Sequence, residues 1–332
     1  MSLTESAYAP DLRSVLPDLQ HEDADDEIVA DLARALRGPA EKCLVASGDF
    51  SATFAGQPHS AGISPAEWNL SDQVALAQMH AVCALAGCDI SVAHTGGCTP
   101  LELERLGLGE ASPAVLGNAI SAARSAGSKY VMAELAYDSV RKCAGAAEAA
   151  EQLAGQAVQI ADSNVHGLLV TIGDADASPA VVRALREVTA LPLAVLLGIS
   201  PAAAAARGDD WLAELCEDLS GQGVACLGLD CCCVADLEPM RDVDQAVRGC
   251  RMGVWLRISD EKTVLAACAE QEAFDSAAPR GRVRNASAGR RGLIGSLCAS
   301  REFIRPNVCS LGVGFTHADA GGLVECLERS RA

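Results

Sequence analysis

Residues 223–239 have the sequence GVACLGLDCCCVADLEP. The apolar run 224–229 has the length of a short strand, and Asp230 and three consecutive cysteines follow it. In a barrel of alternating strands and helices, the carboxyl end of a strand is where chemistry takes place. The stretch therefore predicts a buried strand with thiols at the catalytic rim, although buried cysteine also serves as a small apolar residue.

Seven further apolar runs of this length are spaced along the chain, with helical patterns between them. The predicted strands are residues 43–46, 89–93, 130–135, 167–172, 192–197, 224–229, 253–258 and 308–313. The predicted helices are residues 71–85, 112–126, 146–161, 178–188, 209–219, 237–247, 292–304 and 317–329. Strands that are apolar on both faces and alternate with helices indicate a parallel sheet. Eight such units favour an α/β fold, a closed (β/α)₈ TIM barrel, over an open doubly wound sheet.

An acidic lead-in, residues 1–40, precedes the barrel, which we assign to residues 41–332. Acidic residues stand in front of the run IVADLARAL, and Arg34 and Arg37 lie near its end. This order of charges suits the helix dipole. We therefore expect one N-terminal helix that packs against the body.

The composition argues against several classes of function. The chain has 332 residues and a formal net charge of −18, which disfavours nucleic acid and anionic membranes as partners. No apolar run reaches the roughly 18 residues of a membrane span, and the amino terminus does not resemble a signal peptide. We expect a cytoplasmic protein whose 15 cysteines are reduced thiols.

Several short segments carry a family resemblance. They are EWNLSDQVALAQMHAVCALAGCDISVAHTGGCTPLELERLGL at 67–108, GDFSAT at 48–53, GLDC at 228–231 and LGVGFT at 311–316. In this order they resemble the homocysteine S-methyltransferase domain family. That family includes the homocysteine-binding barrel of cobalamin-dependent methionine synthase and betaine–homocysteine methyltransferase. The resemblance implies a (β/α)₈ barrel that takes part in methionine biosynthesis.

The resemblance also implies a zinc site. In the family, one cysteine after the sixth strand and a Cys-Cys pair after the eighth bind zinc, which lowers the pKa of the homocysteine thiol. Cys231 matches the first ligand, but Val313 and Gly314 stand at the positions of the pair. Thr171 stands where the family has a substrate-binding glutamate, and His94 stands where it has an asparagine.

Because Val313 and Gly314 cannot bind a metal, a zinc site would have to be rebuilt from other groups. The predicted ligands are Cys231, Cys232, His94 and Cys98. Thiolates and imidazole are suitable zinc ligands. Consecutive cysteines cannot all face one side, so Cys231 and at most one neighbour would contribute.

Polar side chains at the ends of other strands form the predicted substrate site. Asp49 follows the first strand and Glu134 ends the third. With His94 and Thr171 they would hold the polar head of an amino acid or take part in proton transfer. Strand-end acids also cap helices, so a structural role is the alternative. Cys231 is the candidate catalytic residue.

A basic segment, residues 280–305, holds seven arginines and one acid. It could bind a substrate carboxylate, a folate tail or a phosphate. A solvated loop or a subunit contact in a homo-oligomer is the favoured alternative, because a run of charges usually forms a solvated face.

Two hypotheses about function remain. The first is a methyltransferase that moves a methyl group from a methylated folate, corrinoid or sulfonium donor to a small-molecule thiol such as homocysteine. A corrinoid donor would come from a separate protein. The second is a divergent barrel without the zinc site, which binds a small molecule or a partner protein and is not catalytic. A third interpretation is a corrinoid-linked methyltransferase that resembles the uroporphyrinogen decarboxylase group. That group shares the barrel, but its His-x-Cys ligand spacing is absent from this sequence.

Overall fold

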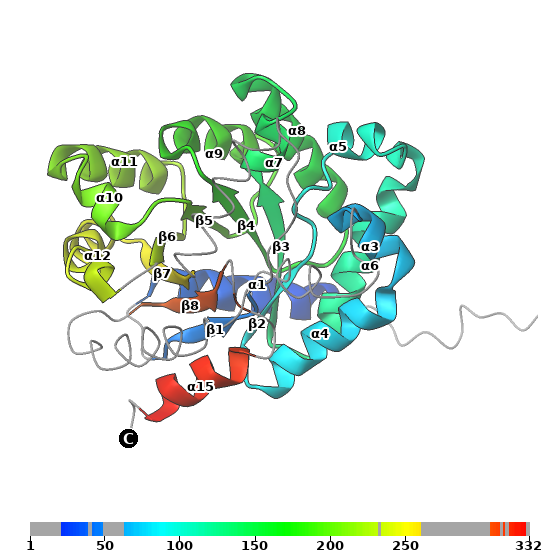
Figure 1. Cartoon of the computed structure of the whole chain (residues 1–332), viewed down its shortest axis with the longest axis horizontal. Coiled ribbons are helices and arrows are strands. Elements are labelled where there is room, and N and C mark those ends of the chain that lie inside the picture. The colour runs from blue at the N-terminus through cyan, green and yellow to red at the C-terminus, as the bar shows by residue number, and fades with distance from the viewer. Residues whose placement is uncertain are drawn as a thin grey trace, which may run out of the picture.

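The computed structural model describes residues 21–38, 42–48, 63–231, 234–259, 306–312, 315 and 319–329. Eight parallel strands close into a barrel in chain order (Figure 1). The strands are β1 (Leu44–Ala46), β2 (Ile90–Ala93), β3 (Tyr130–Ala136), β4 (Gly167–Ile172), β5 (Leu193–Leu197), β6 (Cys226–Cys231), β7 (Gly253–Ile258) and β8 (Val308–Leu311). The predicted (β/α)₈ barrel is confirmed.

Helices surround the barrel (Figure 1). They are α1 (His21–Arg37), α3 (Pro65–Ser71), α4 (Gln73–Leu85), α5 (Pro100–Arg105), α6 (Ser112–Ser125), α7 (Tyr137–Arg141), α8 (Ala146–Ile160), α9 (Ser178–Arg186), α10 (Pro201–Ala205), α11 (Asp209–Gly221), α12 (Met240–Gly249) and α15 (Ala320–Arg329). The predicted helix 71–85 starts later than expected, because Asp72 is its N-cap and accepts a hydrogen bond from the Ala75 N–H at 3.0 Å. The short helix α3 precedes it and was not predicted.

The first and last strands close the ring. Leu44 pairs with Val308 and Ala46 with Ser310 along one side of β1. On the other side of β1, Ala46 pairs with Ile90 of β2. Because every neighbouring pair is parallel, all carboxyl ends of the strands lie at one rim.

Side chains alternate along each strand between the barrel interior and the surrounding helices. The apolar interior is filled by Leu44, Ala46, Ile90, Val92, Tyr130, Met132, Leu169, Ala194, Leu196, Cys226, Trp255 and Val308. The intervening residues belong to a second, larger cluster that also contains the buried faces of the helices. The barrel is therefore a packed core whose polar groups lie toward the rim.

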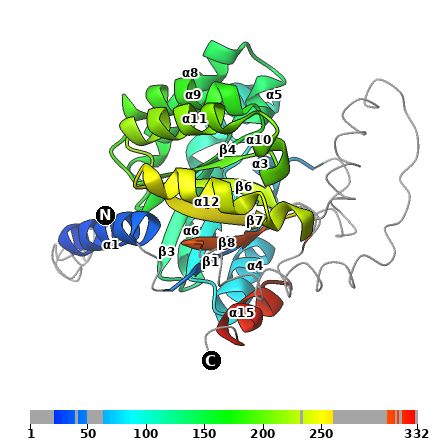
Figure 2. The ribbon, with the colours of Figure 1, turned by 90° about the vertical axis from the view of Figure 1, so that its left-hand side faces the viewer.

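Helix α1 covers the amino-terminal end of the barrel, the end opposite the carboxyl rim (Figure 2). Its Leu32 and Leu36 are fully buried in the interior cluster. The buried side chain of Asn307, just before β8, donates hydrogen bonds to the carbonyl oxygens of Ala35 at 3.2 Å and Gly38 at 2.6 Å. Its Oδ1 accepts a third from a backbone N–H of β7 at 3.1 Å. These contacts seal the bottom of the barrel.

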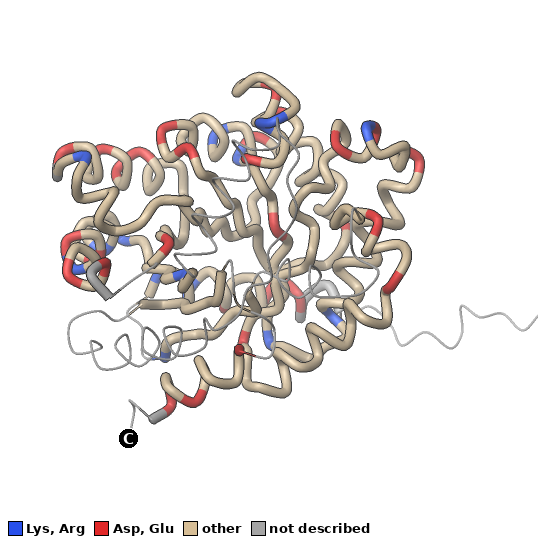
Figure 3. Tube along the Cα trace, in the orientation of Figure 1, with Lys and Arg blue, Asp and Glu red and all other residues tan. Residues whose placement is uncertain are grey.

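Charged residues lie mostly on the surrounding helices (Figure 3). Among the described residues, no helix has both the length and the apolar character needed to cross a lipid bilayer. Every cysteine in the same part of the chain is a free thiol.

Candidate active site

A polar layer lies above the apolar interior, near the carboxyl rim. It consists of the fifth residue of each of four strands: Glu134, Thr171, Asp230 and Arg257. Each is partly exposed, while its neighbours on both sides along the strand are buried. Strand alternation turns these four side chains toward the barrel interior. This is the end of the fold where barrels of this kind carry their active sites.

The carboxylate of Glu134 is held between two elements. Thr171 Oγ1 donates a hydrogen bond to its Oε1 at 3.4 Å. On the other side lies the backbone of Gly96, where a Cβ atom would come within 3.0 Å of Oε2. Thr95 Oγ1 also donates to the Glu134 backbone oxygen at 2.8 Å. The loop after β2 and the end of β4 thus border this carboxylate, and Thr171 orients one of its oxygens.

Arg257 and Asp230 form a two-point ion pair inside the barrel. Arg257 Nη2 donates to Asp230 Oδ2 at 2.6 Å, and Nε donates to Oδ1. Ser259 Oγ donates to the same Oδ1 at 3.2 Å. Beside Arg257 runs the backbone of Gly312, where a Cβ atom would lie 2.9 Å from Arg257 Cγ. Sequence analysis did not predict this pair, although the fifth positions of two adjacent strands could have suggested it.

His94 follows β2 and lies against α3. The side chain of Asn69 on α3 is fully buried. Its Nδ2 donates to the backbone oxygen of His94 at 2.8 Å, and its Oδ1 lies 3.4 Å from His94 Nδ1. Asn69 is a second residue that sequence analysis missed. A signal for the start of α3 was present, because Ser64 and Glu67 form a capping box and Pro65 follows the N-cap.

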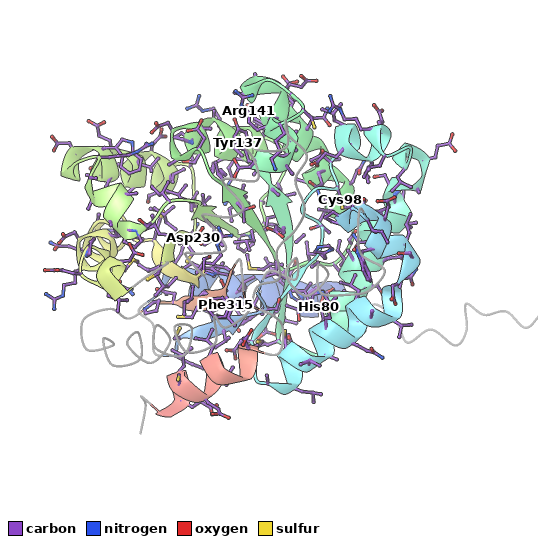
Figure 4. The ribbon with its side chains drawn as sticks, viewed as in Figure 1. His80, Cys98, Tyr137, Arg141, Asp230 and Phe315 are labelled. Atoms are coloured by element: carbon purple, nitrogen blue, oxygen red, sulfur yellow. The ribbon has the colours of Figure 1, made fainter. Side chains whose placement is uncertain are left out.

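His80 of α4 lies deeper, near His94. Burial, and after it the charge that His94 can carry, lowers the pKa of His80 to about 3. His80 is therefore neutral in the folded protein at ordinary pH. Figure 4 labels this side chain on the same side of the barrel as Cys98.

The thiol of Cys98 is fully buried beside Asn69. It accepts a hydrogen bond from Asn69 Nδ2 at 3.8 Å and donates one to the Gly96 oxygen at 3.9 Å. Burial raises the pKa of this thiol, and the carboxylates of Glu102 and Glu134 raise it further. The thiolate form that binds metals is therefore disfavoured at Cys98.

Cys231 ends β6 and is fully buried. Because Asp230 faces the interior, the next residue faces the helices, and Cys231 packs in the outer cluster. Asp230 and Cys98 lie on different sides of the barrel (Figure 4). Within the described part of the chain, no three His, Cys, Asp or Glu side chains come together to hold a metal ion. The described residues thus do not fit the zinc site that the family resemblance implies.

The structure brings together some of the predicted site residues. Glu134 and Thr171 are in contact, and Asn69 joins His94 to Cys98, whereas the side chain of Cys231 packs in the outer apolar cluster. The features outside the described residues, whose roles stay predictions, are Asp49, Cys232, Val313, Gly314, the helix 292–304 and the basic segment 280–305.

No protein-family profile matches this chain, and no curated protein sequence matches it. Among solved structures, the chain is similar to the homocysteine methyltransferase MmuM from Escherichia coli. The metallated form is 16% identical, with 86% of this chain and 96% of that chain covered and a TM-score of 0.58. The oxidised form is 16% identical, with 87% and 96% covered and a TM-score of 0.59. The two chains share a fold. At this identity the similarity extends to the barrel and its order of elements, over nearly the whole of MmuM.

Proposed function

We propose that this barrel transfers a methyl group to the sulfur of a thiol-bearing amino acid such as homocysteine. The observation that supports the proposal is the carboxylate of Glu134 near the carboxyl rim, which accepts a hydrogen bond from Thr171 and lies beside the Gly96 backbone. The barrel around it is similar in fold to MmuM, which is described as a homocysteine methyltransferase.

In this proposal Glu134 binds the ammonium group of the acceptor. A carboxylate that is already oriented loses little freedom when it forms a charge-assisted hydrogen bond to an ammonium. Thr171 supports one of its oxygens at 3.4 Å. Asp49, which follows β1 in the sequence, is proposed to contribute from the same rim.

His94 takes the proton of the acceptor thiol in this proposal. The S–H bond breaks, its proton moves to the imidazole, and the electron pair stays on sulfur. The thiolate then attacks the methyl carbon of the donor, and the leaving group departs with its bonding electrons. The donor is a sulfonium compound, a methylated folate or a methylated corrinoid carried by a separate protein. No step is assigned to zinc, because the described residues do not fit it.

A second candidate function is binding without transfer. It is favoured by the position of Cys231, the residue that matches a family zinc ligand, whose side chain packs among the outer apolar residues. A barrel of this kind would hold a small molecule or a partner protein at the same rim.

The test is an assay for methylated product by mass spectrometry. Reduced protein is incubated with homocysteine and each of the three donor classes, and homocysteine binding is measured in parallel by calorimetry. Methionine formation that Glu134→Gln lowers, and that the exposed-site control Glu151→Gln leaves unchanged, supports transfer. Homocysteine binding without product supports the second candidate, and absence of homocysteine binding contradicts the proposed transfer to homocysteine.

A further inference from the structure

We infer that Asn69 fixes His94 in the neutral tautomer that carries its proton on Nδ1, which makes Nε2 the proton-accepting nitrogen. This assigns a positioning role to a residue that does not itself belong to the polar layer. The inference rests on the proposed function for its catalytic meaning, whereas the tautomer is a property of the fold alone.

The orientation of the Asn69 amide is set by the backbone of His94. The amide atom 2.8 Å from the His94 carbonyl oxygen must be the nitrogen, because a carbonyl oxygen only accepts hydrogen bonds. The same nitrogen lies 3.8 Å from Cys98 Sγ. The two ends of an amide are normally hard to tell apart, but here the acceptor on one side removes the ambiguity. Oδ1 therefore faces the imidazole.

The orientation of the amide in turn determines the imidazole proton. Asn69 Oδ1 lies 3.4 Å from His94 Nδ1, and an amide oxygen can only accept. Nδ1 must therefore be the donor, because the other tautomer would set its lone pair against a lone pair of Asn69, whose side chain is fully buried. A neutral imidazole carries one N–H, so a proton on Nδ1 leaves the lone pair on Nε2.

Asn69 is itself held in place from both sides. The capping box at the start of α3 fixes the helix, with Glu67 N donating to Ser64 Oγ at 3.3 Å and Ser64 N donating to Glu67 Oε2 at 2.7 Å. The backbone oxygen of Asn69 accepts from Asn118 Nδ2 on α6 at 3.1 Å. The Asn69 amide contacts both the backbone oxygen and the imidazole of His94. It therefore fixes the His94 ring relative to the His94 backbone.

This arrangement suits a base at Nε2. When Nε2 takes the proton of a thiol, the imidazole becomes a cation that still donates from Nδ1 to Asn69 Oδ1. The same contact that orients the neutral ring thus also supports its charged form, as the partner of a catalytic histidine does in other enzymes.

The experiment is long-range ¹H–¹⁵N correlation NMR of the histidine rings in the ¹⁵N-labelled full chain, at a pH where His94 is neutral. The His94→Gln spectrum identifies the His94 signals. We expect a protonated Nδ1 and an unprotonated Nε2 in the wild type, with the preferred tautomer in about tenfold excess or more, as one buried hydrogen bond provides.

Three variants separate this role from general stability. Asn69→Leu removes the acceptor, so both tautomers should become populated. Asn69→Asp loses the donor to the His94 oxygen but keeps an acceptor at Nδ1, so it should keep the Nδ1–H pattern. Asn118→Leu breaks the contact of α6 with α3 and should leave the tautomer unchanged even where it lowers the melting temperature.

A wild type with the proton on Nε2 overturns the inference, and so does an Asn69→Leu spectrum identical to that of the wild type. If Asn69→Leu does not fold, the wild-type and Asn69→Asp spectra decide. A protein that shows the Nδ1–H pattern but forms no methylated product would refute the proposed function and leave this inference standing. In an active enzyme, Asn69→Leu should lower kcat about 100-fold with little change in KM, and Asn69→Asp should restore most of it.

Discussion

Arg257 on β7 and Asp230 on β6 face each other across adjacent strands and form a two-point ion pair within the barrel. Their side chains are only 17% and 13% exposed. The pair therefore separates the apolar interior from the rim, and its charges are shielded from most of the solvent.

Removal of one partner of the Arg257–Asp230 pair should destabilise the folded protein. We expect Arg257→Met to lower the free energy of unfolding by up to about 3–5 kcal/mol, because Asp230 stays in its largely enclosed position without the guanidinium. The double variant Arg257→Met/Asp230→Leu should recover a large part of this loss. Urea unfolding at pH 7 measures both.

The matched control is Arg34→Met on α1. Arg34 pairs with Asp31 at 3.0 Å, but its side chain is 74% exposed. Such a pair contributes less than about 1 kcal/mol. Similar losses in Arg257→Met and Arg34→Met would contradict the buried character of the Asp230 pair.

Gly96→Ala should displace the carboxylate of Glu134. The new Cβ would lie 3.0 Å from Oε2 and 3.1 Å from Cδ, which is closer than ordinary contact. We expect homocysteine affinity to fall about 10-fold to 100-fold in calorimetry, because small misplacements of a binding group have effects of this order. Gly117→Ala is the control, since its Cβ would meet no atom within 4 Å. Unchanged affinity in Gly96→Ala would show that Glu134 does not bind the ligand.

His80 should make the protein sensitive to acid. Burial, and then the charge on His94, lowers its pKa to about 3 in the folded state, against about 6.5 in an unfolded chain. Between these values the unfolded chain binds a proton that the folded protein does not. The free energy of unfolding should therefore fall as the pH drops from 6.5 toward 3, by up to about 1.4 kcal/mol per pH unit from this residue.

The variant that isolates this effect is His80→Leu, which cannot be protonated. We expect a shallower decline of stability between pH 6 and pH 4 than in the wild type, measured by urea unfolding at several pH values. Equal slopes in the two proteins would mean that His80 is protonated in the folded state as readily as in the unfolded chain.

Asn307→Ala should loosen α1. The substitution removes both hydrogen bonds to Ala35 and Gly38 and the acceptor of a β7 N–H. Loss of buried hydrogen-bond partners of this kind costs about 2–4 kcal/mol in total. Hydrogen exchange should quicken in α1 before it does in β3 or β4. Arg37→Gln, which removes only an exposed contact with the Gly223 oxygen at 2.8 Å, is the control.

The eight strands could be predicted because each one is a short apolar run between helical patterns. Every predicted run overlaps an observed strand, and residues 167–172 and 253–258 agree in full. The bounds of β6 differ most, with residues 224–229 predicted and Cys226–Cys231 observed. An apolar run shows which residues are buried, and not which residues pair in the sheet. Val224 and Ala225 are buried but precede the strand.

The candidate site could be predicted only in part. The positions of Glu134 and Thr171 near the ends of two predicted strands indicated that both lie at one rim. The two side chains are in contact. The direction of Cys231 follows from strand alternation and not from the motif, since Asp230 before it faces inward. Asn69 acts through a contact with His94 that joins distant elements, which local sequence patterns do not reveal.

The packing of α1 against the amino-terminal end of the barrel also affects folding during translation. Asn307 lies 272 positions after Ala35, which a ribosome adding about 5–20 residues per second covers in tens of seconds. During that interval the apolar face around Leu32 and Leu36 has no finished surface to dock on. The nascent chain is therefore most exposed to aggregation just before its last strand emerges, and a chaperone that shields α1 during translation would raise the yield of native protein.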